Sequence, residues 1–234
     1  MDKVLGSTNQ TEESEWLSVS DLMAGLMVIF LFIAIIFIRP LAEQNLRIKE
    51  IASTWQENET QIYEALEKEF ANDLPRWNAE IEKDTLLIRF KAPEVLFETG
   101  RAAIREQFAE ILRDFFPRYA RVLQAYRDSL EEIRIEGHTS SVWNQETGTN
   151  EAYFRNMELS QARTRAVLQN VLNLPETAEA RLWLQPLLTA NGLSSSHLVT
   201  NEFGAEDRER SRRVEFRVRT KARTEIVRIL EEIE

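Results

Sequence analysis

A single acidic side chain lies at the edge of a long uncharged segment near the N-terminus. Asp21 is followed by residues 22–38, none of which is Asp, Glu, Lys or Arg. An acidic side chain deep in a bilayer costs about 2.5 to 3.5 kcal/mol on insertion scales, and such residues usually face other protein or a proton path. We therefore predict that Asp21 binds protons. The alternative is a helix N-cap, because Ser18, Ser20 and Asp21 are all good capping residues ahead of an apolar core.

The uncharged segment is long enough to cross a membrane. As a helix, residues 22–38 cover roughly 25 Å, and the five preceding residues complete the ~30 Å hydrocarbon core. We predict a transmembrane helix over residues 16–38, after a polar tail over residues 1–15. Trp16 favours the membrane interface, which would place Asp21 about 7 Å below it, where water is scarce.

Composition removes several classes of function. The chain has 234 residues, no cysteine and two histidines, His138 and His197, far apart in the sequence. A thiol nucleophile, a disulfide and a Cys-ligated metal are therefore excluded, and we expect no cofactor and no His-built metal site. The formal net charge of -10 argues against direct binding of nucleic acid. Beyond the span, the length allows one soluble domain of ordinary size.

The ends of the span bear on its orientation. Residues 1–15 are acidic where the first part of a signal peptide is basic, so we do not expect cleavage. One basic residue, Lys3, precedes the span, and three follow it closely, namely Arg39, Arg47 and Lys49. Taken alone, the positive-inside rule therefore favours a cytoplasmic C-terminus.

Residues 39–83 are predicted to be a helical linker. Within them, residues 41–72 contain neither Gly nor Pro and are rich in Glu, Gln, Ala and Leu, which favours a helix. Ile48, Trp55 and Ile62 recur at heptad spacing, as in a short coiled coil. An amphipathic helix packed on its own domain accounts for the same spacing equally well.

Residues 84–234 are predicted to form an α/β domain, an α+β sandwich of one sheet and one layer of helices. Alternating or apolar runs predict strands at residues 86–91, 132–137 and 213–219. Helices are predicted at residues 102–116, 119–130, 160–172 and from 222 onwards. The third helix is assigned an apolar face, formed by Leu159, Ala162, Ala166 and Val167.

Four segments of this domain together resemble OmpA-like peptidoglycan-binding domains over about residues 84–220. They are VLFETG at 95–100, EGHT at 136–139, NMELSQAR at 156–163 and RRVEF at 212–216. This family binds the diaminopimelate of cell-wall peptides, whose zwitterionic end carries carboxylates and an ammonium. The resemblance implies a peptidoglycan site formed by Thr139, Ser140, Asn156, Leu159, Arg163 and Arg213.

Each implied role fits the chemistry of the residue. Arg163 would present a planar, bidentate fork to a carboxylate, and Asn156 would add directional hydrogen bonds. Leu159 would orient Arg163, and Arg213 would brace the cationic side. His138 is expected to orient the loop rather than to catalyse, because no partner marks it as a general base.

One position departs from the family pattern. The family usually has Asp after Gly-His-Thr, and that Asp contacts the ammonium of the ligand, whereas this chain has Ser140. A hydroxyl accepts a hydrogen bond but carries no negative charge. The ammonium contact is therefore expected to weaken, or to move to a neighbour such as Glu146 or Glu151.

The N-terminal span and this domain together resemble the B subunits of ion-driven stators. Residues 18–32, 137–141 and 153–160 are most similar to the B subunits of Zorya anti-phage defence systems. The resemblance implies an Asp21 that binds protons, with Na⁺ not excluded as the ion. It also implies a homodimer within a ring of MotA-like A subunits (ZorA), coupled indirectly to cytoplasmic effectors. The protein would lie in the bacterial inner membrane, with its N-terminus cytoplasmic and its domain periplasmic. This orientation is opposite to the one that the positive-inside rule alone favours.

Three other classes are weighed beside this one. A flagellar-type, MotB-like stator shares the mechanism and differs in what its A subunit drives. A passive OmpA-like wall tether would need only Arg163 and the span. A hydrolase is disfavoured, because no nucleophile, base and orienting residue form a recognisable set, and we expect no enzyme activity.

Overall fold

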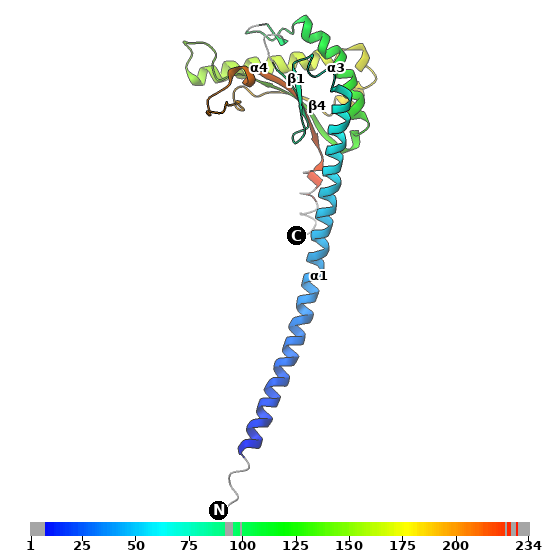
Figure 1. The fold of residues 1–234 in the computed structure, drawn as a ribbon, viewed down its shortest axis with the longest axis vertical. Helices are drawn as coiled ribbons and strands as arrows, with labels where there is room; N and C mark the ends of the chain where they lie inside the picture. The colour runs from blue at the N-terminus through cyan, green and yellow to red at the C-terminus, as the bar shows by residue number, and fades with distance from the viewer. Residues whose placement is uncertain (1–7, 92–95, 99, 223, 226–227, 229–234) are drawn as a thin grey trace, which may run out of the picture. The chain divides into compact units, whose positions relative to one another are not determined.

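The computed structural model describes residues 8–91, 96–98, 100–222, 224–225 and 228. The chain divides into two units, of which Thr54–Val227 is one and Met1–Ser53 with Arg228–Glu234 is the other. The sheet and the helices that cover it all belong to Thr54–Val227 (Figure 1).

The first element, α1, is a helix over Thr8–Phe70 with Pro40 inside it. It therefore begins within the polar segment of residues 1–15. From Val19 onwards it is long and apolar enough to cross a membrane. Large apolar side chains from Val19 to Leu41 are exposed. Such a surface is typical of a segment that contacts lipid or another protein.

The sheet has five strands in the order β1-β2-β5-β3-β4. Their bounds are Ala79–Glu82, Leu87–Phe90, Arg213–Thr220, Leu130–His138 and Leu188–Gly192, in that order across the sheet. Only β3 and β4 pair in parallel; the other neighbours are antiparallel. The predicted strands correspond to β2, β3 and β5, whereas the two edge strands β1 and β4 were not predicted.

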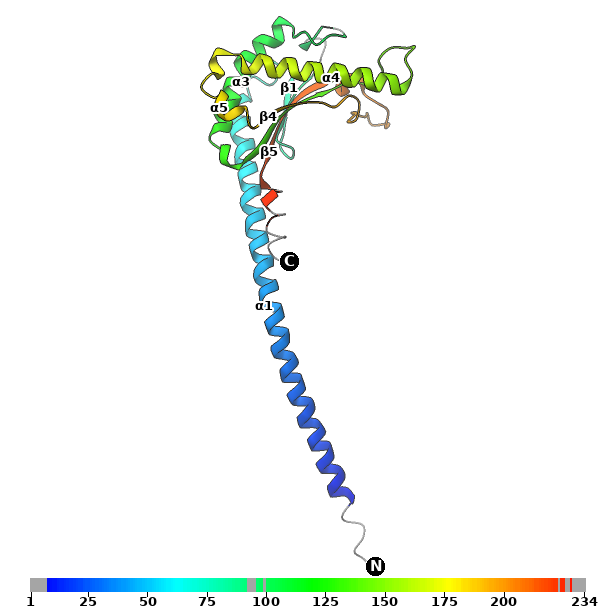
Figure 2. The ribbon, with the colours of Figure 1, turned by 180° about the vertical axis from the view of Figure 1, so that it is seen from behind.

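Two long helices pack on one face of this sheet. They are α3, Glu106–Gln124, and α4, Thr149–Leu172, and both views show α4 crossing the strands (Figures 1 and 2). The short elements are η1, Arg127–Ser129, η2, Pro175–Thr177, α5, Arg181–Leu184, and α6, Arg208–Ser211. The two helices predicted around Pro117 are one helix, α3, which runs through that proline. The helix predicted from residue 222 falls mostly outside the described residues.

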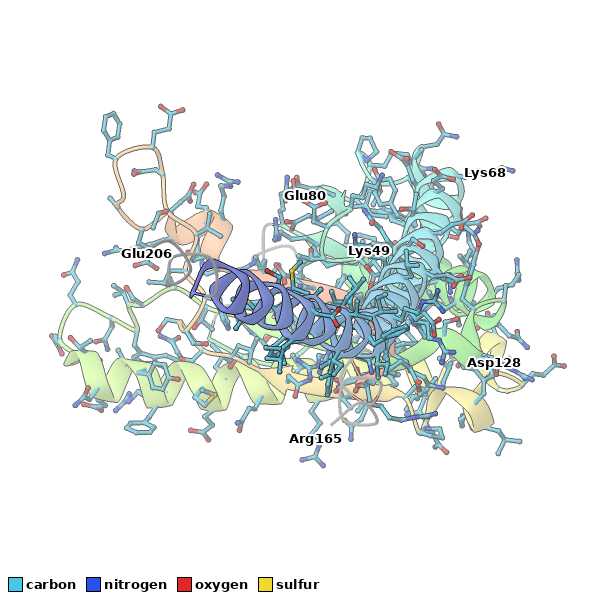
Figure 3. The ribbon with its side chains drawn as sticks, turned by 90° about the horizontal axis from the view of Figure 1, so that it is seen from below. Lys49, Lys68, Glu80, Asp128, Arg165 and Glu206 are labelled. Carbon is cyan, nitrogen blue, oxygen red and sulfur yellow. The ribbon has the colours of Figure 1, made fainter. Side chains whose placement is uncertain are left out.

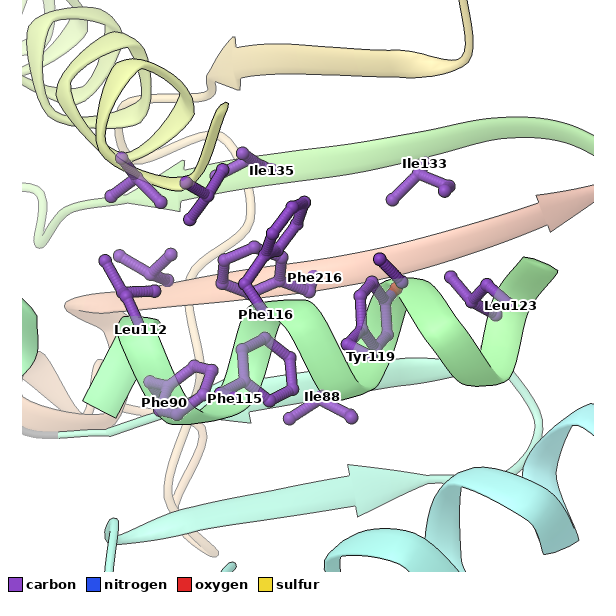
Figure 4. Packing of buried hydrophobic residues seen from close by; sticks show 14 of the residues in the cluster. Ile88, Phe90, Leu112, Phe115, Phe116, Tyr119, Leu123, Ile133, Ile135 and Phe216 are labelled. Carbon is purple, nitrogen blue, oxygen red and sulfur yellow. The ribbon is translucent and has the colours of Figure 1, made fainter. Parts of the chain in front are cut away.

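Aromatic side chains fill the space between α3 and the sheet. Phe115 packs against Phe90 and Phe216, with ring centroids 5.2 and 5.0 Å apart (Figure 4). The last turns of α1 add Ile62 and Phe70, both fully buried in the same core. Ile62 is therefore a core residue, as the amphipathic-helix alternative required. The compact unit accordingly starts well before the boundary expected at residue 84.

The face that α4 turns to the sheet is more polar than predicted. Its buried residues are Ala152, Asn156, Ser160, Thr164, Val167 and Val171. Of the predicted apolar face, Val167 is buried, Leu159 and Ala166 are half-buried, and Ala162 is exposed. Close packing explains the difference, because a Cβ at Gly137 would lie 2.7 Å from Thr164 Cγ2, and one at Gly192 would lie 2.2 Å from the Gln161 nitrogen. Small side chains let the helix approach this closely.

Candidate functional site

A pocket of about 200 Å³ lies where α4, the loop after β3 and the turn at residues 97–100 meet. Ten described residues line it: Phe97, Gly100, Thr139, Ser140, Val142, Trp143, Asn156, Leu159, Arg163 and Arg212. We call this the α4 pocket. Five of the six residues predicted for peptidoglycan binding are in it, so the structure brings together residues that lie far apart in the sequence.

Arg163 is the main cation of the α4 pocket, and backbone groups hold its side chain in place. Its Nε donates to the Arg101 carbonyl at 3.0 Å and its Nη2 to the Glu98 carbonyl at 3.4 Å. The guanidinium lies over the Phe97 ring, 4.8 Å from the ring centroid. Burial, helped by the charge of Arg212, lowers the pKa of Arg163 to about 10. A charge held in this way is prepared for an anion.

Three neutral polar residues form the wall beside Arg163. Asn156 is buried, and its Nδ2 donates to the Ser140 carbonyl at 3.1 Å, which ties α4 to the loop after β3. Ser140 Oγ donates to the Val142 carbonyl over a long distance, 3.4 Å. Thr139 is 4% exposed, and its Oγ1 has no hydrogen-bond partner among the described residues. A buried hydroxyl without a partner costs free energy in the folded chain.

Arg213 does not reach the α4 pocket. Arg212, in extended backbone just before β5, lines the pocket, whereas Arg213, the first residue of β5, lies on the other face of the sheet. There Arg213 Nε donates to Glu215 Oε1 at 2.7 Å, and its Nη1 donates to the carbonyls of His197 and Ser211. The bracing role predicted for Arg213 is therefore corrected to a role on the opposite face.

Neither acid suggested as a substitute for the family Asp lies in the pocket. Glu151 is exposed on α4 and pairs with Arg155, 2.5 Å away. Glu146 is exposed in the preceding loop. A third acid, Glu206, is tied to this loop: its Oε1 accepts from the Ser141 nitrogen at 2.8 Å and its Oε2 from Ser141 Oγ. The 200–206 segment and the loop after β3 lie at the same end of α4 in both views (Figures 1 and 2).

The opposite face of the sheet carries a network of ion pairs centred on Glu215. This carboxylate is 1% exposed and accepts from Arg89 Nε at 2.7 Å, Arg213 Nε at 2.7 Å and Arg217 Nη2 at 3.1 Å. Burial alone would raise its pKa, but His138 and Arg213 beside it hold the pKa well below its usual range. Glu215 therefore stays ionised and joins β2, β3 and β5.

His138 faces this network, away from the α4 pocket. Its Nε2 lies 3.5 Å from Glu215 Oε2 and 4.0 Å from Glu136 Oε2. Burial, followed by the charge of Arg213, lowers the pKa of His138, although the two carboxylates act in the other direction. Because the hydroxyls of Thr139 and Ser140 line the other side, His138 is not placed to act as their base.

Glu136, His138 and Glu215 also have the spacing of a metal site, with ligand atoms within 4.8 Å of one another. However, arginines already occupy the carboxylate oxygens, since Arg217 Nε donates to Glu136 Oε2 at 3.0 Å while Glu215 accepts from three guanidiniums. A divalent cation would have to displace these donors and remain among like charges. We therefore interpret the trio as part of the ion-pair network.

Asp21, the other predicted site residue, lies in the interior of α1, thirteen residues after Thr8. An N-cap flanks the first turn of a helix, and α1 begins at Thr8, so the capping interpretation is wrong. Ala24 and Gly25 follow at the spacing that puts them on the same helical face. A Cβ at Gly25 would meet nothing within 4 Å. The interfacial role predicted for Trp16 falls outside the described side chains.

Residues that were not predicted complete the α4 pocket. They include Phe97, Trp143 and Arg212. The alternation of a strand over residues 213–219 was a signal for Arg212, since it separates the faces of Arg212 and Arg213. Phe97 and Trp143 come from irregular segments, for which sequence periodicity gives no signal.

Comparisons with known proteins agree with this architecture. The Zorya protein ZorB of Escherichia coli strain Crooks is 46% identical over 99% of this chain and 100% of its own length. A second Escherichia coli ZorB is 25% identical over 90% of this chain and 82% of its own length. A solved structure described as a putative MotB-like protein from Desulfovibrio vulgaris has a TM-score of 0.52 and 24% identity, covering 72% of this chain and 98% of that one. No protein-family model matches the chain.

The α/β domain has the fold of this MotB-like structure. It follows the N-terminal apolar helix α1, as predicted. The sequence likeness extends over the full length of both chains and includes the span as well as the domain. This chain therefore belongs to the ZorB family of Zorya proteins.

Proposed function

We propose that this chain is the B subunit of a proton-driven motor complex of the inner membrane that acts in defence against phage. In this proposal Asp21 binds the ion, and the sheet domain anchors the complex to peptidoglycan. Membership of the ZorB family supports the assignment to a Zorya system.

One observation supports wall binding above the others, namely the guanidinium of Arg163 in the α4 pocket. It is fixed by two backbone carbonyls and an aromatic ring. Arg212 lies in the same pocket. Peptide stems of the cell wall carry carboxylates, and a pre-positioned Arg fork recognises a carboxylate better than a mobile one does.

Proton binding at Asp21 is supported by its place inside α1, directly before the uncharged residues 22–38. In a dimer, paired Asp21 residues would exchange protons as these pass along the contact with A subunits. A charge that crosses about 100 mV releases about 2.3 kcal/mol, which is comparable to the insertion cost of an ionised carboxylate. One proton per step is thus sufficient to alternate the two states.

Partners and orientation follow from these two roles. A wall-binding domain belongs in the periplasm, which puts the N-terminus in the cytoplasm and outweighs the small excess of basic residues after the span. The exposed apolar surface of α1 fits a second copy of this chain within a ring of MotA-like A subunits. Cytoplasmic effectors would respond to the A ring and not to this chain directly.

A passive wall tether is the main alternative, since it needs the same pocket and the same span. A passive tether does not need the carboxyl group of Asp21, so a substitution of Asp21 distinguishes a tether from a motor subunit. A flagellar-type stator would use both features and would differ in the A subunit that it turns.

Wall binding is tested by sedimentation of the full-length chain, in detergent, with purified peptidoglycan sacculi. Arg163→Ala should weaken retention by about tenfold or more, because it removes a charge-assisted hydrogen-bond donor. Arg165→Ala is the matched control, since Arg165 is exposed on the same helix and points away from the domain (Figure 3). Equal retention of both variants would place the wall contact elsewhere.

A further inference from the structure

The charges that line the α4 pocket are of one sign. Among its described residues, Arg163 and Arg212 are cationic, and none is Asp or Glu. The two guanidiniums are near enough for the charge of Arg212 to lower the pKa of Arg163. A ligand with an ammonium group would be repelled by the two guanidiniums. Like charges placed together weaken binding strongly.

The remaining walls offer an ammonium neutral acceptors, such as the Ser140 hydroxyl, and no negative charge among the described residues. Val142, Trp143 and Leu159 are apolar, and the Ser140 carbonyl already accepts from Asn156. An ammonium must keep its hydrogen bonds or lose much of its hydration free energy, so an apolar wall disfavours it. An acyl or methyl group has no such cost there.

The acid tied to the neighbouring loop does not change this balance. Both oxygens of Glu206 accept from Ser141, one from the nitrogen and one from the hydroxyl. Glu206 is not among the described residues that line the pocket. Its contacts hold the loop that carries Thr139 and Ser140.

By contrast, a carboxylate matches the positive charge of the pocket. It would receive charge-assisted bonds from Arg163, in a pocket where Arg212 adds a second positive charge. In a peptide, the α-nitrogen beside such a carboxylate is acylated and neutral, whereas in a free amino acid it is an ammonium.

We propose that the α4 pocket binds the carboxylate of an amino acid whose α-nitrogen is acylated, and that it rejects the free zwitterion. This inference rests on the proposed wall binding and specifies the chemical group that is bound. It departs from the zwitterionic contact that the family resemblance implied.

The test is competition for sacculi by two small ligands of equal length. Free meso-diaminopimelate carries two ammonium groups, and its N,N′-diacetyl derivative carries none. The diacetyl compound should displace the full-length chain at about tenfold lower concentration, because like-charge contact is absent. Free diaminopimelate that competes equally well or better would overturn the inference while leaving wall binding intact.

Ser140 allows a complementary gain of function. Ser140→Asp puts a carboxylate on the pocket wall and should raise the competition by free diaminopimelate about tenfold. Ser140→Asn, of similar size and without charge, should not. Identical preferences in the two variants, provided that both melt at the temperature of the natural chain, would contradict the inference. If either variant unfolds, the test is the comparison on the natural chain, that is, which of the two competitors displaces it at the lower concentration.

Two outcomes separate this inference from the proposed function. A natural chain that sacculi do not retain at all refutes wall binding itself. A retained chain that neither competitor displaces has its wall contact outside the α4 pocket, which overturns the inference alone.

Discussion

Arg212 and Arg213 are adjacent in the sequence but act on opposite faces of the sheet. Arg212 lines the α4 pocket with Arg163, whereas Arg213 Nε bonds to the buried carboxylate of Glu215 at 2.7 Å. The α4 pocket and the ion-pair network therefore meet at the start of β5, where Arg212 and Arg213 are consecutive residues. Removal of the charge of Arg212 and removal of the charge of Arg213 should therefore have different effects.

Arg212→Ala is expected to lower retention by sacculi with little effect on stability, since Arg212 is half-buried at the edge of the pocket. Arg213→Ala is expected to lower the free energy of unfolding by about 1 to 3 kcal/mol, because Glu215 loses a buried partner and keeps its charge. Thermal unfolding and sedimentation of both full-length variants check this. The opposite pattern would assign Arg213 to the pocket.

Acid should destabilise the domain through His138. Burial and the charge of Arg213 lower the pKa of His138 in the folded chain, whereas the unfolded chain keeps the ordinary value near 6.5. The unfolded state therefore binds the proton more readily, and stability declines as the pH falls below about 6.5. Glu215, whose folded pKa is also lowered, adds a further loss below about 4.5.

His138→Gln should flatten the upper part of this decline, between about pH 7 and pH 5, in melting temperatures measured across pH. His197→Gln is the control, since it removes the other histidine, which is exposed. An unchanged slope in the His138 variant would show that another group titrates there.

Gly192→Ala should disrupt the contact between β4 and α4. Its Cβ would lie 2.2 Å from the backbone nitrogen of Gln161, which cannot move without the helix. We expect a loss of about 2 kcal/mol or more, as for overpacked cores. Gly148→Ala is the matched change, because a Cβ there meets nothing within 4 Å. A similar melting temperature for both variants would contradict the close approach of α4.

Arg118→Ala should loosen the end of α1 from α3. Arg118 donates to Glu69 Oε1 at 2.7 Å, the Glu69 carbonyl at 2.8 Å and Asp73 Oδ2 at 2.9 Å, and it lies over the Phe70 ring. Loss of these contacts should cost about 1 to 3 kcal/mol of unfolding free energy. The exposed Arg113, changed to Ala, should cost little. If Arg118→Ala and Arg113→Ala lowered the free energy of unfolding equally, the contacts of Arg118 with the end of α1 would not stabilise the fold.

The sequence was informative wherever regular periodicity coincided with burial. It predicted β2, β3 and β5, because apolar residues such as Ile88, Ile135 and Phe216 alternate with charged ones. The edge strands were missed because β1 reads AEIE and β4 reads LTANG, with too few apolar residues for a clear pattern. The polar face of α4 was missed because Gly137 and Gly192, on other elements, create the space that it fills.

The candidate site was predictable to a similar extent. Family motifs supplied Asn156 and Arg163, but only tertiary structure shows that Arg212 and not Arg213 lies beside them. Arg163 is held by the backbone carbonyls of Glu98 and Arg101. Every residue type has such a carbonyl, so these contacts could not be predicted from the sequence. Likewise, the N-cap alternative for Asp21 was decided by the start of α1 at Thr8, which local capping preferences did not indicate.

The central claim is that Asp21 carries protons for a motor that is anchored to the wall. Asp21→Asn keeps the size of the side chain and removes its proton exchange, and Ser20→Ala is a neighbouring control without a titratable group. Both variants are compared for protection against phage in cells that carry the complete defence system, with membrane insertion and dimer formation verified. The account predicts that the Asn variant inserts and pairs normally but loses protection, while the control retains it. Full protection by the Asn variant would contradict the account and favour a passive tether.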